Sequence, residues 1–233
     1  MRVIHVRAQS FGSNTYLIVS GTHALVVDPA VSVSAIVSTA GELGASIDGI
    51  LLTHGHYDHM LSLDTLRQTL HVPAMIHKND AVMLTDGKKN AFYAFYGQER
   101  VFGAADETFE DGDELCVGDE RFCVIHTPGH TGGSCCFVCG NALITGDTLF
   151  AEGIGRCDLW SGDIDDMRDS LSRLRTLDPE LRIRPGHGMG EHLGFALPAS
   201  PISKERPLRS RSQKISATYL PRVTRYTPRQ ASR

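Results

Sequence analysis

One short segment of the chain concentrates side chains that bind metals. Residues 53–59 read Thr-His-Gly-His-Tyr-Asp-His, which places the imidazoles of His54, His56 and His59 and the carboxylate of Asp58 within six positions. Neutral imidazole and carboxylate are ligands that suit zinc or iron. The segment therefore predicts a metal site.

Three further candidate ligands each follow a strand-like segment and a glycine. They are His130 in Thr-Pro-Gly-His-Thr, Asp147 in Thr-Gly-Asp-Thr and His187 in Arg-Pro-Gly-His-Gly. Glycine lets the backbone turn tightly, so that the next side chain can face a crevice without steric conflict. The repeated order of strand, glycine and ligand favours one shared site rather than chance.

The elements that must position these residues are both strands and helices. The apolar run 47–52 predicts a strand that delivers the histidine cluster, and a helix is expected over 60–70. Crevices beyond the carboxyl ends of strands are where α/β proteins usually bind ligands. Further helices are expected over 32–43 and 164–177, and further strands over 3–7, 14–20, 24–28, 74–77, 108–117, 121–127, 134–139, 142–145 and 182–184. This mixture predicts a layered α/β architecture.

Composition limits the class of protein. The chain has 233 residues, 41% hydrophobic and 21% charged, which is ordinary for a soluble globular protein. Its length allows one sizeable core or two small ones and does not decide between them. No run of eighteen apolar residues appears and the start shows no secretory pattern, so we expect no membrane span and a cytoplasmic location.

The six cysteines fit a reducing compartment, because their spacing is not that of a secreted disulfide framework. Cys136 and Cys139 form a C-x-x-C pattern. In a strand, residues three apart point to opposite faces, which is poor geometry for one metal. We therefore expect buried thiols there.

The charge is distributed unevenly. From Lys204 onward the chain carries nine Lys or Arg and one Glu, whereas the first 203 residues carry 14 basic and 26 acidic side chains. The acidic body argues against a nucleic-acid surface there. The Pro-, Ser- and Arg-rich composition predicts a disordered tail over 198–233 after a domain over 1–197. That tail is either solvated or bound to nucleic acid or an acidic partner.

At this point a family is recognisable. The Thr-His-x-His-x-Asp-His segment, followed in order by His130, Asp147 and His187, resembles the metallo-β-lactamase-fold hydrolases over about residues 14–187. Residues 146–150 and 155–158 resemble the small glyoxalase-II-like, or hydroxyacylglutathione hydrolase-like, branch. The resemblance implies a four-layer αβ/βα sandwich with the site at one edge of two facing sheets.

The resemblance also implies two divalent metal ions, zinc in the first place, with iron or manganese as alternatives. One ion would be held by His54, His56 and His130, and the other by Asp58, His59 and His187, with Asp147 bridging them and Asp28 orienting a ligand histidine. A bridging hydroxide would attack a carbonyl carbon, with Asp58 and Asp147 as the catalytic carboxylates. A small-molecule acyl thioester suits this chemistry, because thiolate is a good leaving group.

Two other functions remain open. A persulfide dioxygenase of the same fold would hold one iron through His54, His130 and Asp147. A non-catalytic module would use its metal for structure only, although seven candidate ligands exceed the four of a closed structural site.

Roles near the site are open as well. Tyr57 is either a hydrogen-bond donor or a packed aromatic. Arg156 and Asp158 form either an ion pair beneath the site or an ordinary surface pair. The aromatic segment 88–103 is either a mobile flap or an anchored loop.

Overall fold

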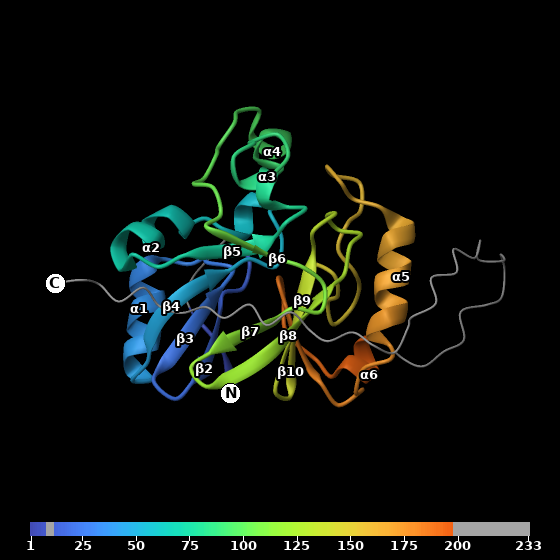
Figure 1. Cartoon of the computed structure of the whole chain (residues 1–233). Coiled ribbons are helices and arrows are strands. Elements are labelled where there is room, and N and C mark those ends of the chain that lie inside the picture. Colours follow the sequence, from blue (N-terminus) through green and yellow to red (C-terminus); the bar gives the residue numbers. More distant parts are fainter. Residues whose placement is uncertain (8–11, 198–233) are drawn as a thin grey trace.

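The computed structural model describes residues 1–7 and 12–197. Strand pairing builds two sheets that face each other, one of six strands and one of five (Figure 1). The first has the order β1 (Arg2–His5), β2 (Tyr16–Ser20), β3 (His23–Val27), β4 (Ser46–Leu51), β5 (Ala74–His77) and β6 (Glu107–Phe109). The second has the order β11 (Arg182–Pro185), β10 (Ala142–Gly146), β9 (Cys135–Cys139), β8 (Glu120–His126) and β7 (Glu114–Val117).

The direction of the strands decides where their ends meet. β3, β4, β5 and β6 are parallel to one another, and β10 is parallel to β11. The remaining neighbours pair antiparallel. Because parallel strands end at the same edge of a sheet, the loops after β3, β4 and β5 gather at one edge, and those after β10 and β11 gather likewise.

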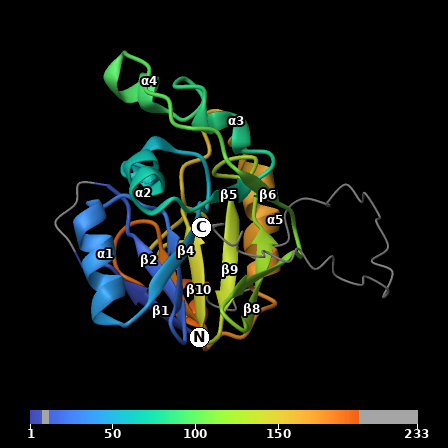
Figure 2. The same cartoon turned by 60° about the vertical axis from the view of Figure 1, so that its left-hand side comes forward.

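Helices cover the outer faces of both sheets. α1 (Val33–Glu42) and α2 (Leu63–Leu70) lie against the first sheet, and α5 (Ile164–Leu174) lies against the second (Figure 1). Ser32 caps α1, since its hydroxyl accepts a hydrogen bond from the amide of Ala35 at 3.3 Å. The shorter helices are η1 (Tyr57–His59), α3 (Ala81–Leu84), α4 (Phe92–Tyr96) and α6 (Leu193–Ala196). α3 and α4 stand together beyond one end of the sheets (Figure 2).

Three apolar layers separate these four layers of secondary structure. The alternation along β2 shows how one strand serves two of them: Leu17 packs toward the helices, and Tyr16 and Ile18 pack toward the second sheet. The third layer lies between the second sheet and α5 and includes Leu143 and Leu174. The predicted four-layer αβ/βα sandwich is therefore confirmed.

Some predicted elements differ from the structure. The single strand predicted over 108–117 is wrong, because the chain divides there into β6 and β7, which belong to different sheets. A tight turn causes the break: Gly112 has a φ of +80°, and the Asp113 carboxylate accepts a hydrogen bond from the amide of Glu110 at 2.9 Å. The helix predicted from residue 60 begins at Leu63, because a 3₁₀ turn precedes it.

Other predictions concern the cysteines, the tail and the membrane. Cys136 and Cys139 are buried free thiols, and they lie in different apolar layers, as the strand geometry predicted. The tail predicted over 198–233 lies outside the described residues. None of the helices within residues 1–7 and 12–197 has both the length and the apolar character needed to cross a bilayer.

Candidate metal centre

The seven candidate ligands meet at one edge of the sandwich, and both sheets supply them. Residues 54–59 follow β4 of the first sheet. His130 follows β8, Asp147 directly follows β10, and His187 follows β11 of the second. Within each of three groups, all ligand atoms lie within 4.8 Å of one another: His54, His56 and His130; His54, His59 and Asp147; Asp58, His59 and His187.

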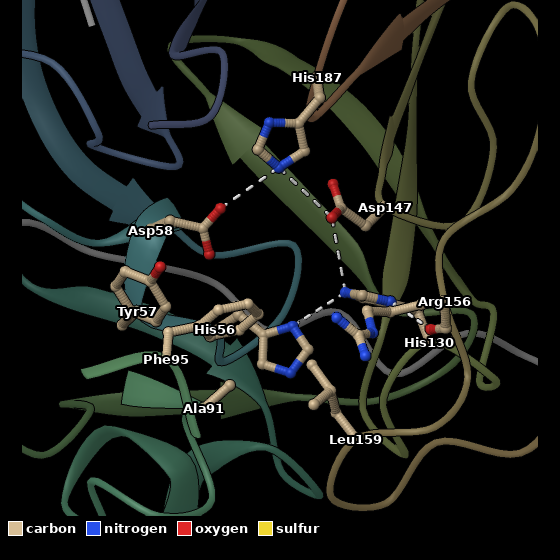
Figure 3. A pocket seen from close by; sticks show the side chains of 10 residues that line it. All are labelled: His56, Tyr57, Asp58, Ala91, Phe95, His130, Asp147, Arg156, Leu159 and His187. Atoms are coloured by element: carbon tan, nitrogen blue, oxygen red, sulfur yellow. Dashed lines mark hydrogen bonds and ion pairs between the residues drawn. The ribbon is translucent and has the colours of Figure 1, made fainter. Parts of the chain in front are cut away.

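The Asp147 carboxylate lies between the histidines of these groups. Its Oδ1 is 3.3 Å from His59 Nε2, and its Oδ2 is 3.5 Å from both His130 Nε2 and His187 Nε2 (Figure 3). On one side, His56 Nδ1 lies 2.8 Å from His130 Nε2. On the other, His187 Nε2 lies 3.3 Å from an oxygen of Asp58. Asp147 therefore faces both sets of candidate ligands.

Unpaired atoms in this cluster test whether cations fit. His54 Nε2 is buried and makes no hydrogen bond within the described part of the chain, and the buried His59 Nε2 and Asp147 Oδ1 face each other at 3.3 Å without a hydrogen bond of good geometry. Buried polar atoms in proteins are nearly always well paired, so three such atoms gathered in one place favour a further partner. A divalent cation supplies that partner, and imidazole nitrogen with carboxylate oxygen is a donor set that suits zinc, iron or manganese. The residues present therefore fit the metal centre that the resemblance implies.

Burial keeps several of these imidazoles in the form that binds metal. It lowers the pKa of His54 well below its usual value, lowers that of His130, and lowers that of His56 to about 3. A buried imidazolium without a counter-charge is disfavoured, so these rings are neutral near pH 7. Neutral imidazole is the ligand state.

The carboxylates have the opposite effect on the other two histidines. Burial alone would lower the pKa of His59, but the charges of Asp147 and Asp28 outweigh it and raise that pKa well above normal. Hydrogen bonds to Asp147 and Asp58 raise the pKa of His187 to about 9. Without a cation, two imidazolium protons thus balance the carboxylates, and a metal ion would displace these protons.

The second nitrogen of each of three candidate ligand histidines is held by a neighbour. His59 Nδ1 donates to Asp28 Oδ2 at 2.9 Å, and His130 Nδ1 donates to the carbonyl of Arg156 at 2.7 Å. His54 Nδ1 lies 3.1 Å from the hydroxyl of Thr53. Contacts of this kind fix ring orientation and tautomer in metal sites. Asp28 thus occupies the orienting position that the resemblance implied.

Two of the glycines before candidate ligands are required by the close approach of chain segments. A methyl group on Gly186 would overlap Asp147 Oδ1 and would lie 2.6 Å from a ring carbon of His59. Gly146 has a φ of +47°, and a methyl group there would lie 2.6 Å from the Thr53 hydroxyl. The strand–glycine–ligand pattern therefore reflects crowding around the cluster.

Sequence reasoning missed one residue that ties the ligand loops together. Asp80 is fully buried, and its Oδ2 accepts hydrogen bonds from the amide of Gly55 at 3.0 Å and the hydroxyl of Thr131 at 2.6 Å. Gly55 lies between two candidate ligands, and Thr131 follows His130. The available signal was its place just beyond β5, a parallel strand that ends at the same edge.

An open pocket of about 180 Å³ leads to the cluster. Its polar lining comprises His56, Asp58, His130, Asp147, Arg156 and His187, and its other lining residues are Tyr57, Ala91, Phe95 and Leu159 (Figure 3).

Contacts decide the roles that were open around this pocket. Arg156 and Asp158 form an exposed bidentate pair at 2.6 and 2.8 Å, so they are a surface pair, although the Arg156 carbonyl holds His130. Tyr57 packs edge-on against Phe92, with ring centroids 5.2 Å apart. Its ring is therefore packed against α4.

The segment 88–103 is anchored to the candidate metal-binding loop, residues 53–59. The amide of Tyr57 donates to the carbonyl of Asn90 at 3.0 Å. The buried side chain of Asn90 donates to the carbonyl of Arg100 at 2.9 Å and accepts from the amide of Phe92 at 3.0 Å. These bonds close a loop that holds α4 beside the pocket.

Comparisons with known proteins agree with this geometry. Residues 9–187 match the family model described as "Metallo-beta-lactamase superfamily". The chain is 30% identical over 197 residues to the "Probable polyketide biosynthesis zinc-dependent hydrolase PksB" of Bacillus subtilis, a match that covers 83% of this chain and 81% of the relative. It is 34% identical over 179 residues to the "Probable metallo-hydrolase YqgX" of the same species, covering 76% of this chain and 85% of the relative.

Solved structures are similar as well. The B3 metallo-β-lactamase BLEG-1 matches with a TM-score of 0.78 and 27% identity, over 86% of this chain and 98% of that one. TTHA1623 in a di-iron-bound form matches with a TM-score of 0.72 and 30% identity, over 84% and 99%. ETHE1 from Myxococcus xanthus matches with a TM-score of 0.70 and 27% identity, over 85% and 84%. With the family model spanning most of its length, the chain belongs to the metallo-β-lactamase superfamily.

Proposed function

We propose that this chain is a metal-dependent hydrolase that binds two divalent ions and cleaves small-molecule acyl thioesters, as in the glyoxalase-II-like branch. The observation that carries the proposal is the position of Asp147 between two sets of candidate ligands, where the buried His54 Nε2 makes no hydrogen bond within the described residues. The relatives named as a zinc-dependent hydrolase and a metallo-hydrolase support it, and so does the di-iron form of TTHA1623.

The residues divide the work as follows. One ion would be held by His54, His56 and His130. The other would be held by Asp58, His59 and His187, and Asp147 would contact both ions. When bound, the ions supply Lewis acidity and lower the pKa of a water molecule toward neutrality. In the metal-free protein Asp58 and Asp147 are ionised: burial raises their pKa values, but the charge of His59 outweighs burial and lowers that of Asp58 to about 2 and that of Asp147 far below normal. A bound cation would favour the ionised carboxylates in the same way. Each carboxylate can therefore accept a hydrogen bond from a water and orient it.

The choice of a thioester is supported by the lack of a good proton donor among the pocket-lining residues. Alkoxide and amide leaving groups need a proton, whereas a thiolate leaves without one. Among the pocket-lining residues, burial makes His56 and His130 neutral and poor acids, and burial also raises the pKa of Tyr57. His187 would be occupied as a ligand. A leaving group that departs as an anion suits such a pocket.

The test is metal counting together with thioester cleavage. Zinc-loaded protein should contain two ions per chain and should hydrolyse members of an acyl-thioester panel in the absence of oxygen. His56→Ala should abolish turnover, and His23→Ala, on an exposed side chain at the start of β3, should not. One iron per chain with oxygen consumption and no thioester cleavage would instead identify the dioxygenase, whose single iron leaves Asp58, His59 and His187 without a role.

A further inference from the structure

We propose that the apolar side of the pocket binds the acyl chain of the substrate and that the enzyme prefers uncharged, apolar acyl groups. This inference rests on the proposed thioester hydrolysis. The acyl wall comprises Tyr57, Ala91, Phe95 and Leu159; Ala91, Phe95 and Leu159 line the side of the pocket away from Asp147 and His187, and Tyr57 lies beside Asp58 (Figure 3). A thioester carbonyl at the metal ligands would place its acyl substituent along this wall.

Exposure of large aromatic side chains is the first argument. Phe95 is 54% exposed although it lines the pocket, and Tyr96, on the same helix, is 57% exposed. Trp160, next to Leu159 in the chain, is 39% exposed. Exposed apolar surface that is gathered beside a polar site typically marks a ligand groove, because water there is displaced favourably by an apolar group.

The acyl wall is also preorganised, because packing and hydrogen bonds hold its residues in position. Tyr57 lies between two candidate ligands in the sequence. The centroid of its ring lies 6.0 Å from that of Phe95 and 5.7 Å from that of Tyr96. The hydrogen bonds that link Tyr57, Asn90 and Phe92 fix the position of α4 relative to the candidate metal-binding loop. Preorganisation of this kind lowers the cost of ordering the site when a ligand binds.

Charge argues for an uncharged acyl group. Arg156 is the one Lys or Arg among the ten residues that line the pocket, and both its Nε and a terminal nitrogen bind the Asp158 carboxylate. Its guanidinium carbon lies 5.9 Å from the centroid of the Phe95 ring, so the ion pair borders the wall. The lining therefore offers no unpaired Lys or Arg side chain to a carboxylated acyl group.

The first test is a chain-length series on one small thiol. We would measure kcat/KM of zinc-loaded protein for N-acetylcysteamine thioesters of acetate, butanoate, hexanoate and succinate. Full burial of a methylene gives about a fourfold gain, so a wall that covers one side of the chain should give about twofold per methylene. Hexanoyl should then exceed acetyl by roughly 15-fold, and succinyl should be poorer than butanoyl. A flat series, or a preference for succinyl, would overturn the inference.

Two variants on α4 locate the effect. Phe95→Ala should remove most of the hexanoyl advantage, so that the ratio of kcat/KM for hexanoyl to that for acetyl falls toward unity. Tyr93→Ala is the matched control, because Tyr93 is a similarly exposed aromatic on the same helix but does not line the pocket. It should preserve the full series. If the two variants behave alike, the wall does not set specificity.

Product binding separates this inference from the proposed function. Hexanoate should bind zinc-loaded protein about 15-fold more tightly than acetate, and Phe95→Ala should reduce that ratio to near unity. If no thioester is cleaved, the proposed function fails, and the binding ratio alone decides the inference. If thioesters are cleaved and both ratios are near unity, the inference fails and the proposed function stands.

Discussion

Replacing Asp28 by asparagine removes one carboxylate that supports the candidate metal-binding loop. Asp28 does not line the pocket, so the change tests this support alone. Asp28 Oδ1 accepts from the Thr53 amide at 2.8 Å, and Oδ2 accepts from the Thr53 hydroxyl at 2.7 Å and His59 Nδ1 at 2.9 Å. All three neighbours donate, whereas an amide offers one oxygen. Asparagine tolerates the φ of +50° found there, so the backbone should not change.

The magnitude follows from the bonds that the amide cannot make. In either orientation its NH₂ group faces a buried donor, so at least one charge-assisted bond is lost, which costs about 2–4 kcal/mol in the stability of metal-free protein. His59 keeps at best a neutral acceptor. Loss of such a supporting contact typically weakens metal binding by about 10- to 100-fold.

Two measurements check this prediction. Denaturant unfolding of metal-free protein should show the loss of stability, and competition with a chromogenic chelator should show the loss of zinc affinity. Asp169→Asn, the same change on an exposed residue of α5, should alter neither. Wild-type zinc affinity in Asp28→Asn would refute the claim that Asp28 positions His59 for a metal.

Three further predictions concern the cluster itself. Asp147→Asn should reduce zinc content and thioester turnover together, since Asp147 faces both ligand sets; full activity would exclude a bridging role. Gly186→Ala should abolish metal binding in protein that remains folded by circular dichroism, because the added methyl overlaps Asp147; normal zinc content would show that the loop relaxes. Because the pKa of His187 is raised to about 9 and that of His59 well above normal, both hold protons at pH 7.5 that a metal must displace. Calorimetry in buffers of different ionisation enthalpy should show proton release, and zinc affinity should fall as pH decreases; affinity independent of pH between 6 and 8 would contradict this.

Much of the architecture was predictable because the chain marks it locally. Alternating or continuous apolar runs predicted β2, β3, β4 and β5, and the parallel arrangement of β3, β4 and β5 brings the segments after these three strands to one edge. The same reasoning predicted that His54, His130 and His187 would meet; the structure places His54 beside His130, and both His130 and His187 3.5 Å from Asp147. That they bind metal stays a prediction until ions are counted.

What the sequence did not reveal depends on distant partners. Asp80 resembles any acidic residue in a loop, and only the fold shows that Gly55 and Thr131, 25 and 51 positions away, converge on its carboxylate. The division of 108–117 between two sheets was missed because apolar residues flank a tight turn, and a strand pattern does not state which sheet a strand joins. The anchoring of α4 depends on Tyr57, which precedes it by 35 positions.

The mixed origin of each ligand group has a consequence for the durability of the protein. Because His54 and His56 come from one sheet and His130 from the other, and Asp58 and His59 likewise face His187, each cation would cross-link the two halves of the sandwich. Free zinc at about 100 times its dissociation constant would add about 2.7 kcal/mol to the free energy of unfolding for each site that it fills. Metal supply in the cell would thereby affect the stability of this protein as well as its catalytic rate. At low zinc, destabilising substitutions that are tolerated at high zinc would unfold the protein.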